Sequence, residues 1–289
     1  MRFVNFRLDD RAGTALQNKD GSLVGRFADD PKYPGSIADL VVRGGDALAS
    51  AARSLAGGPA LEGGRIEYLP PFPTPPKIIC LGLNYADHAA EGGFKPPSYP
   101  TIFARFASSL VGHGAPLIRP RVSTQFDYEG ELVAVVGRGG RHISREAALD
   151  HICGYSIFND ASVRDFQMKT PQWTVGKNFD GTGAFGPAFV TADELPRGAA
   201  GLSLQTRLNG KVMQSASTTQ MIFDVVTTVA LITEALTLEA GDVLVMGTPS
   251  GIGMARTPQI FMKAGDVCEI EIEGLGILRN PIADEPAET

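Results

Sequence analysis

The chain has 289 residues, of which 43% are hydrophobic and 20% are charged, and its formal net charge is -6. This composition is that of a globular protein with a sizeable core, and its mild acidity, without any run of Lys and Arg, argues against nucleic acid or an anionic membrane as the main partner. Three cysteines without a CxxC pair indicate neither a disulfide framework nor a thiolate zinc site. Because the N-terminus lacks the apolar segment of a signal peptide, we expect a cytoplasmic protein.

Residues 1–72 are expected to form a small α/β domain. Alternating apolar residues predict strands over 3–8 and 23–27. Apolar residues at helical spacing over 36–55 predict a helix, which two consecutive glycines at 44 and 45 split into two. The proline-rich segment 69–76 cannot be helical, and it marks the boundary to a second domain over 73–289.

The second domain is predicted to consist of short strands with few long helices. The dipeptide Asn209-Gly210 predicts a hairpin between strands over 202–207 and 211–214. The clearest helix is predicted over 221–236. Further strands are predicted over 78–83, 131–137, 154–158, 243–246 and 267–272. Because strands and helices do not alternate regularly, the predicted fold class is α+β.

Glu129 and Glu131 are the first candidate site residues. They are two positions apart where the strand over 131–137 begins, so their side chains point to the same face. Two carboxylates side by side inside a protein repel, and either one takes up a proton or a cation lies between them. A solvated strand face that carries two glutamates explains the same pattern equally well.

Asp160 is a third candidate, at the end of the apolar segment 154–158. The local sequence favours a simpler interpretation, in which Asp160 is the N-cap of a helix over 161–167. If the three acids meet, their oxygen atoms suit a hard cation such as Mg²⁺, Mn²⁺ or Ca²⁺ better than zinc.

His88 and Glu91 are three residues apart and share a face if the segment is helical. A carboxylate beside an imidazole raises its basicity, as a water-activating base requires. A surface His–Glu pair without a role is the commoner case. The segment 92–97 predicts a flexible loop that could act as a lid.

Lys177 could balance the charge of the acidic cluster and hold a substrate oxygen, although a surface lysine is more common. The nearby glycines Gly181, Gly183 and Gly186 match the formula GxGxxG. They do not predict a dinucleotide site, because Pro187 and the strand-like segment 188–190 stand where the helix of such a site must begin.

Read together, these segments resemble the fumarylacetoacetate hydrolase family, and most closely its short acylpyruvase-like members. The matching pieces occur in order over residues 77–281. They are NYADH (84–88), DYEGEL (127–132), GY (154–155), ND (159–160) with RD (164–165), GK (176–177), GP (186–187), NG (209–210), GDV (241–243) and GTPSG (247–251).

The resemblance implies a mixed β-sandwich roll, a homodimer and a site for Mg²⁺ or Mn²⁺, with Ca²⁺ as a substitute in crystals. The implied metal ligands are Glu129, Glu131 and Asp160. His88 and Glu91 are implied as a water-activating dyad on a lid. Three residues are implied to contact the substrate's oxygen atoms, namely Lys177, Gln167 and Thr248.

Arg105 is a departure from this pattern, since many members have a lysine there. Arginine keeps the charge but offers a two-pronged grip on a carboxylate. We therefore expect Arg105 to contact the substrate and to affect which chemical groups the site accepts at the far end of the substrate.

The leading functional hypothesis is metal-dependent hydrolysis of a carbon–carbon bond in an acylpyruvate or a related 1,3-diketo acid during catabolism. The same site could instead isomerise or decarboxylate a 2-hydroxy-dienoate or oxo-acid, because both reactions need a stabilised enolate and no hydrolytic water. The non-enzymatic alternative is an oxo-acid-binding protein with a structural metal. In each case the expected partner is a small oxo-acid.

Overall fold

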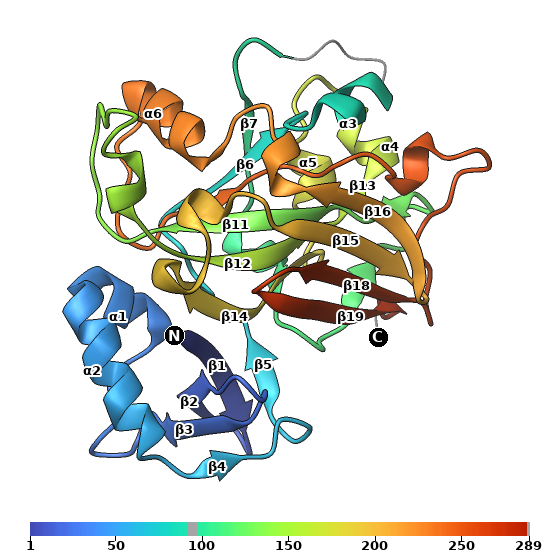
Figure 1. The fold of residues 1–289 in the computed structure, drawn as a ribbon. Coiled ribbons are helices and arrows are strands. Elements are labelled where there is room, and N and C mark those ends of the chain that lie inside the picture. Colours follow the sequence, from blue (N-terminus) through green and yellow to red (C-terminus); the bar gives the residue numbers. More distant parts are fainter. Residues whose placement is uncertain (92–96, 288–289) are drawn as a thin grey trace.

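A large mixed sheet forms the centre of the computed structural model, which describes residues 1–91 and 97–287 (Figure 1). In sheet order its main strands are β4 (Ala60–Leu61), β3 (Leu23–Phe27), β2 (Arg11–Gln17), β1 (Arg2–Leu8), β14 (Gly183–Thr191), β12 (Ile152–Asp160), β11 (Gly130–Val136), β17 (Val243–Val245), β6 (Ile78–Gly82) and β7 (Thr101–Ala104). Two short strands flank this path: β5 (Glu67–Leu69) pairs with β1, and β8 (Leu110–Val111) pairs with β14.

A second sheet packs against this one. Its strands, in order, are β16 (Lys211–Ser217), β15 (Ser203–Leu208), β18 (Val267–Ile272), β19 (Gly276–Asp284) and β9 (Leu117–Arg119). The predicted hairpin is confirmed: β15 and β16 pair around Asn209 and Gly210, whose φ angles of 52° and 77° are those of a tight hairpin turn. A third, two-stranded sheet joins β10 (Phe126–Asp127) to β13 (Ser162–Val163).

The strand β11 is buried on both faces and belongs to two cores. Leu132 and Ala134 pack with residues of the second sheet, such as Ile270. Val133 and Val135, which point the other way, belong to a second core that also includes residues of the helices α1 (Ile37–Arg43) and α2 (Gly45–Ala56). The middle of the large sheet is therefore covered on both sides, which holds rigidly the end of β11 where the candidate acids lie.

The first seventy residues extend the large sheet. Phe3 of β1 pairs with Phe189 of β14, and the two rings stack with centroids 6.4 Å apart. The predicted split of the helix is confirmed, since Gly44 separates α1 from α2. The division into domains at 72/73 stays a prediction.

Two helix boundaries differ from those predicted. Helix α6 (Val225–Ala235) begins four residues later than predicted, because the Asp224 carboxylate accepts the Thr227 N–H at 2.7 Å and caps it there. The helix predicted over 161–167 is only α4 (Arg164–Gln167), since residues 162–163 pair as strand β13. The α+β class is confirmed.

The segment with the GxGxxG formula continues as strand β14, so the helix that a dinucleotide site requires does not begin there, as the sequence predicts. The remaining helices are α3 (Ala86–Glu91), α5 (Thr174–Lys177) and the 3₁₀ turns η1 (Ala107–Ser109), η2 (Ala148–His151), η3 (Ala192–Glu194), η4 (Arg197–Ala199), η5 (Thr218–Gln220) and η6 (Gly253–Ala255).

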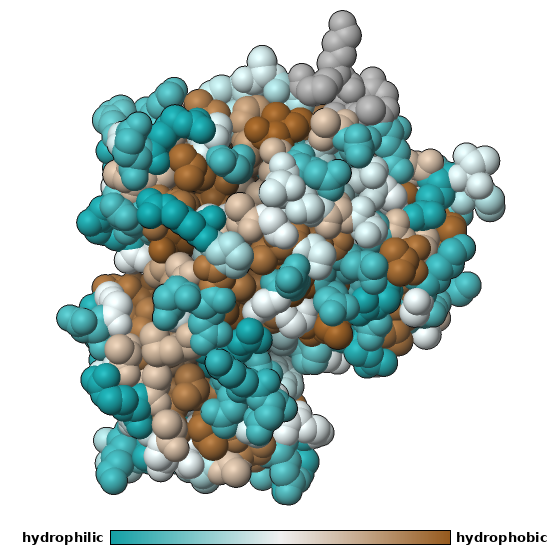
Figure 2. Space-filling view, in the orientation of Figure 1, coloured by the Kyte–Doolittle hydropathy of each residue, from teal (hydrophilic) through white to brown (hydrophobic). Residues whose placement is uncertain are grey.

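The face of the molecule seen in Figure 2 is mainly hydrophilic, with hydrophobic residues in separate small patches. In the part of the chain that the structure describes, none of the helices has the length and apolar character needed to cross a bilayer.

Candidate metal centre and active site

Glu129, Glu131 and Asp160 meet inside the protein. The strands β11 and β12 are antiparallel neighbours, and the Asp160 N–H donates to the Glu129 carbonyl at 2.9 Å. This pairing brings the three side chains together, each offering one carboxylate oxygen within 4.8 Å of the others. All three residues are buried, at 5%, 1% and 0% exposure. The interpretations as a solvated strand face and as a helix N-cap are therefore wrong; Val163, not Asp160, precedes α4.

The charges in this cluster are not balanced evenly. Burial raises the pKa of Glu131 well above its usual value, and the neighbouring Asp160 and Glu129 carboxylates raise it further. Burial also acts to raise the pKa of Glu129, but the cations of Lys177 and Arg164 outweigh it and lower that pKa. Glu131 is thus the carboxylate with too little positive charge nearby. A hard divalent cation among the three oxygen atoms fits this donor set and would remove the repulsion.

Lys177, the last residue of α5, lies against two of these acids. Its Nζ is 2.7 Å from Glu129 Oε2 and 2.6 Å from Asp160 Oδ2. Burial lowers the pKa of Lys177, but Asp160 and Glu129 outweigh it, so the net shift is upward and the ammonium stays charged. The alternative of a surface lysine is wrong, because Lys177 is only 2% exposed.

Arg105 lies behind Asp160. Its side chain is completely buried, its Nη1 pairs with Asp160 Oδ1, and its Nη2 donates to Thr182 Oγ1 at 2.9 Å. Its Nε donates to Ser109 at 3.2 Å. The guanidinium therefore orients a candidate metal ligand, whereas the sequence suggested a contact with the substrate.

Replacement of Arg105 by lysine tests this position. Lysine cannot reproduce the planar set of donors to Asp160, Thr182 and Ser109, so Asp160 should lose its fixed orientation. We expect Arg105→Lys to weaken Mn²⁺ binding about 10–100-fold, as loss of a residue behind a metal ligand typically does. The KM for substrate at saturating Mn²⁺ should change little. A large change in KM with intact Mn²⁺ affinity, measured by calorimetry, would support the direct substrate contact.

His88 and Glu91 lie on helix α3, as the spacing predicts. His88 lines the same pocket as Glu129, Glu131 and Lys177. Its Nδ1 is 3.6 Å from Glu91 Oε2 and has no hydrogen-bond partner among the described residues. The Gly251 N–H, in turn, holds the Glu91 carboxylate at 3.0 and 3.1 Å. Since Nδ1 faces Glu91, Nε2 is the nitrogen left for chemistry in the pocket. Residues 92–96 of the expected lid lie outside the described residues.

The pocket has a volume of about 130 Å³, and Gln167 and Thr248 contribute to its lining. Thr248 is held rigidly, because its Oγ1 donates to the Gly130 carbonyl at 3.0 Å and accepts from Gln214 at 2.8 Å. Gln167 accepts a hydrogen bond from Arg164 at 2.9 Å. Both side chains are therefore placed where they could contact a substrate.

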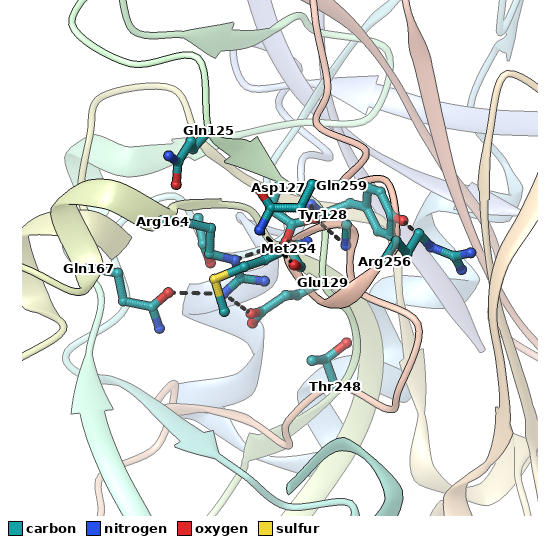
Figure 3. A network of polar contacts seen from close by, with 12 residues as sticks. Gln125, Asp127, Tyr128, Glu129, Arg164, Gln167, Thr248, Met254, Arg256 and Gln259 are labelled. Atoms are coloured by element: carbon teal, nitrogen blue, oxygen red, sulfur yellow. Dashed lines mark hydrogen bonds and ion pairs between the residues drawn. The ribbon is translucent and has the colours of Figure 1, made fainter. Parts of the chain in front are cut away.

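Arg164 is a pocket residue that the sequence analysis missed. Its Nε donates to Asp127 Oδ2 at 2.9 Å, and its Nη1 lies 2.6 Å from Glu129 Oε1 (Figure 3). Its Nη2 is buried and has no partner among the described residues, which leaves a charged donor free for an anion. The sequence held one indication, the pair Arg164-Asp165 within the family resemblance, but its burial depends on contacts between distant segments.

Comparison with known proteins identifies the family of this chain. The family model "Fumarylacetoacetate (FAA) hydrolase C-terminal" matches residues 77–283. The chain is 39% identical over 289 residues to the mitochondrial oxaloacetate tautomerase fahd2 of Xenopus laevis, with coverage of 98% of this chain and 90% of that protein.

Two solved structures are similar over 99% of this chain and 100% of their own. The fumarylacetoacetate hydrolase of Exiguobacterium antarcticum is 35% identical with a TM-score of 0.85. The 5-carboxymethyl-2-hydroxymuconate delta-isomerase of Mycobacterium smegmatis is 28% identical with a TM-score of 0.77. The named relatives are enzymes that include a tautomerase, a hydrolase and an isomerase. By its matched family model and its end-to-end relatives, the chain belongs to the fumarylacetoacetate hydrolase family.

Proposed function

We propose that this protein is a metal-dependent tautomerase that interconverts the enol and keto forms of a short 2-oxo acid such as oxaloacetate. The observation that carries the proposal is the buried trio Glu129, Glu131 and Asp160 with the charged Lys177 beside it. Relatives that match 98% of this chain are named oxaloacetate tautomerases, which supports this choice among the reactions of the family. The three acids would hold Mg²⁺ or Mn²⁺.

Tautomerisation moves one proton between the carbon next to the keto group and the keto oxygen. The double bond shifts between carbon–carbon and carbon–oxygen, and no heavy atom gains or loses a bonded neighbour. When bound, the divalent cation would supply Lewis-acid polarisation of that oxygen. His88 takes the proton from carbon at Nε2 and returns it to oxygen, while Glu91 stabilises the imidazolium from the Nδ1 side. Lys177 offers its ammonium to the negative charge that develops on the oxygen. Arg164 binds a substrate carboxylate through its free Nη2.

Hydrolysis of a carbon–carbon bond in an acylpyruvate is the second candidate. It is favoured by the His88–Glu91 pair, because an imidazole backed by a carboxylate can deprotonate water as well as carbon. In that reaction water adds to the distal carbonyl, the carbon–carbon bond breaks, and pyruvate leaves as its enolate.

Product analysis separates the candidates. The Mg²⁺- or Mn²⁺-loaded protein is mixed with enol oxaloacetate and, separately, with acylpyruvates, and products are followed by ultraviolet absorbance and mass spectrometry. Faster loss of the enol at unchanged mass supports the tautomerase. Pyruvate with a second acid means hydrolysis, and carbon dioxide means decarboxylation. Binding of an oxo-acid without any turnover would support the non-enzymatic alternative, an oxo-acid-binding protein with a structural metal.

His88→Ala is expected to lower kcat about 10²–10⁴-fold, the usual contribution of a positioned general base. Mn²⁺ affinity should persist, because His88 is not among the three acids that would hold the ion. The matched control is His142→Ala, which removes a histidine that does not line the pocket. Intact turnover in His88→Ala, measured beside Mn²⁺ binding by calorimetry, would contradict the assigned role.

We further propose a homodimer in the cytoplasm. Sedimentation and cell fractionation test these two expectations.

A further inference from the structure

One wall of the active-site pocket is formed by Gly82 and the indole of Trp173. Gly82 ends strand β6, and Trp173 immediately precedes helix α5. A Cβ atom on Gly82 would lie 2.2 Å from Cζ3 and 2.8 Å from Cη2 of the indole, and the three nearest atoms it would meet all belong to Trp173. The indole therefore occupies the space that any other residue at position 82 would need for its side chain.

The ring of Trp173 is also held from another side. Phe103 contacts it edge to face, with centroids 5.6 Å apart and an angle of 66° between the planes. The Lys177 N–H donates to the Trp173 carbonyl at 3.2 Å, so Trp173 lies one helical turn before the lysine whose ammonium contacts Glu129 and Asp160. The wall is thus fixed in position beside the charged end of the pocket.

We propose that the contact between Gly82 and Trp173 limits the size of the acid that the pocket accepts. A 2-oxo acid whose group beyond the enolisable carbon is no larger than a carboxylate fits, and an acid with an aryl group there meets the indole. The volume of about 130 Å³ agrees with this limit. The proposal rests on the proposed function, because it places the substrate in the same pocket. The physical reason is that a rigid packed wall discriminates roughly 10–200-fold for small differences in substrate size.

Oxaloacetate and phenylpyruvate provide a matched test, since both enolise at the same carbon and differ in its substituent, carboxylate or phenyl. The measured quantity is the ratio of kcat/KM for phenylpyruvate to that for oxaloacetate. In Trp173→Ala this ratio should rise at least about tenfold over wild type. The control is Val175→Ala, in the helix that Trp173 precedes. Val175 is 62% exposed and outside the pocket lining, so the ratio should not change. An unchanged ratio in Trp173→Ala would overturn the proposal.

A suppressor experiment tests the contact itself. Gly82→Ala should displace the indole, because the three atoms nearest to the added methyl group all belong to Trp173. Gly82→Ala alone should therefore impair turnover of both acids. The double variant Gly82→Ala with Trp173→Ala should recover to the level of Trp173→Ala. Persistent impairment of the double variant would show that Gly82 is needed for another reason, which contradicts the proposed contact.

Binding of acids that cannot enolise separates this proposal from the proposed function. Oxalate and phenylglyoxylate serve as the short and the bulky probe, and calorimetry gives their Kd values on the Mg²⁺-loaded protein. The ratio of the phenylglyoxylate Kd to the oxalate Kd should fall at least about tenfold in Trp173→Ala. If that ratio falls while no enolisable acid reacts with any variant, the size limit stands and the tautomerase is wrong. If enol oxaloacetate reacts but neither ratio moves, the tautomerase stands and the size limit is wrong.

Discussion

Glu131→Gln is expected to abolish tight binding of Mg²⁺ and Mn²⁺ and to lower kcat/KM by about 10³-fold or more, since metal catalysis contributes several kcal/mol and each 1.36 kcal/mol is tenfold. The amide keeps nearly the same shape and can still accept the Gly247 N–H, which donates to Glu131 at 2.5 Å. The substitution thus removes a charged ligand and little else. Calorimetric titration with Mn²⁺ and the enol-decay assay measure the two effects.

In the absence of metal, Glu131→Gln should keep or raise the stability of the folded protein, although it weakens metal binding and activity. The pKa of Glu131 is raised in the folded state by burial and by Asp160 and Glu129. Such a group contributes stability that is fully present below its unfolded pKa of about 4.3 and is lost as pH rises through the folded pKa. Metal-free wild type should therefore lose stability as the pH rises from about 4.3 through the folded-state pKa of Glu131. Glu131→Gln should lose less and should melt at or above the temperature of metal-free wild type at neutral pH.

Added Mn²⁺ should raise the melting temperature of wild type and leave that of Glu131→Gln unchanged, because only a bound ligand stabilises the folded state by mass action. A control substitution, Glu146→Gln, changes a fully exposed carboxylate and should leave the response to Mn²⁺ intact. Equal stabilisation of Glu131→Gln and wild type by Mn²⁺ would contradict the assignment of Glu131 as a ligand.

Lys177→Met is expected to produce the second large effect. Loss of the ammonium leaves Glu129 and Asp160 buried without their contacts at 2.7 and 2.6 Å. Breaking a buried ion pair by removing one partner costs about 3–5 kcal/mol, so the metal-free variant should unfold at a lower denaturant concentration. Mg²⁺ or Mn²⁺ should restore much of this stability, because the ion supplies positive charge to the same acids. Chemical denaturation with and without the ion measures both.

Turnover by metal-loaded Lys177→Met should still be lower by about 10²–10³-fold in kcat, the usual loss when one donor to a developing oxyanion is removed. Lys169→Met is the matched control, since Lys169 is exposed and its Nζ lies over the ring of Phe166. A folded, metal-loaded Lys177→Met with wild-type kcat would show that Lys177 only balances charge.

The fold was predictable where the pattern is local. Asn209 and Gly210 specify their turn through their own conformational preferences, and consecutive glycines at 44 and 45 mark the break between α1 and α2. Strand β14 was predicted only in its second half, over 188–190. Its first half includes Gly183, Ala184 and Gly186, which have low strand propensity, and it is extended because β12 pairs with it.

The site was predictable in its residues but only partly in its geometry. The two glutamates were placed correctly by the period of two along a strand, which is a local property. Asp160 reads locally as a helix cap, and its position in the cluster depends on the pairing of β11 with β12, two segments that are separate in the chain. The same holds for Arg105 and Arg164, whose burial comes from tertiary contacts. The sequence did not predict the contact of Arg105 with Asp160, and it assigned no role to Arg164.

A crystal soaked with Mn²⁺ and measured at the manganese absorption edge offers the most direct test that three acids share one ion. We expect a single strong anomalous peak in the pocket, within about 2.0–2.6 Å of an oxygen atom from each of Glu129, Glu131 and Asp160, the range for such cations with oxygen ligands. No peak at this position, or a peak that one of the three carboxylates does not reach, would contradict the account.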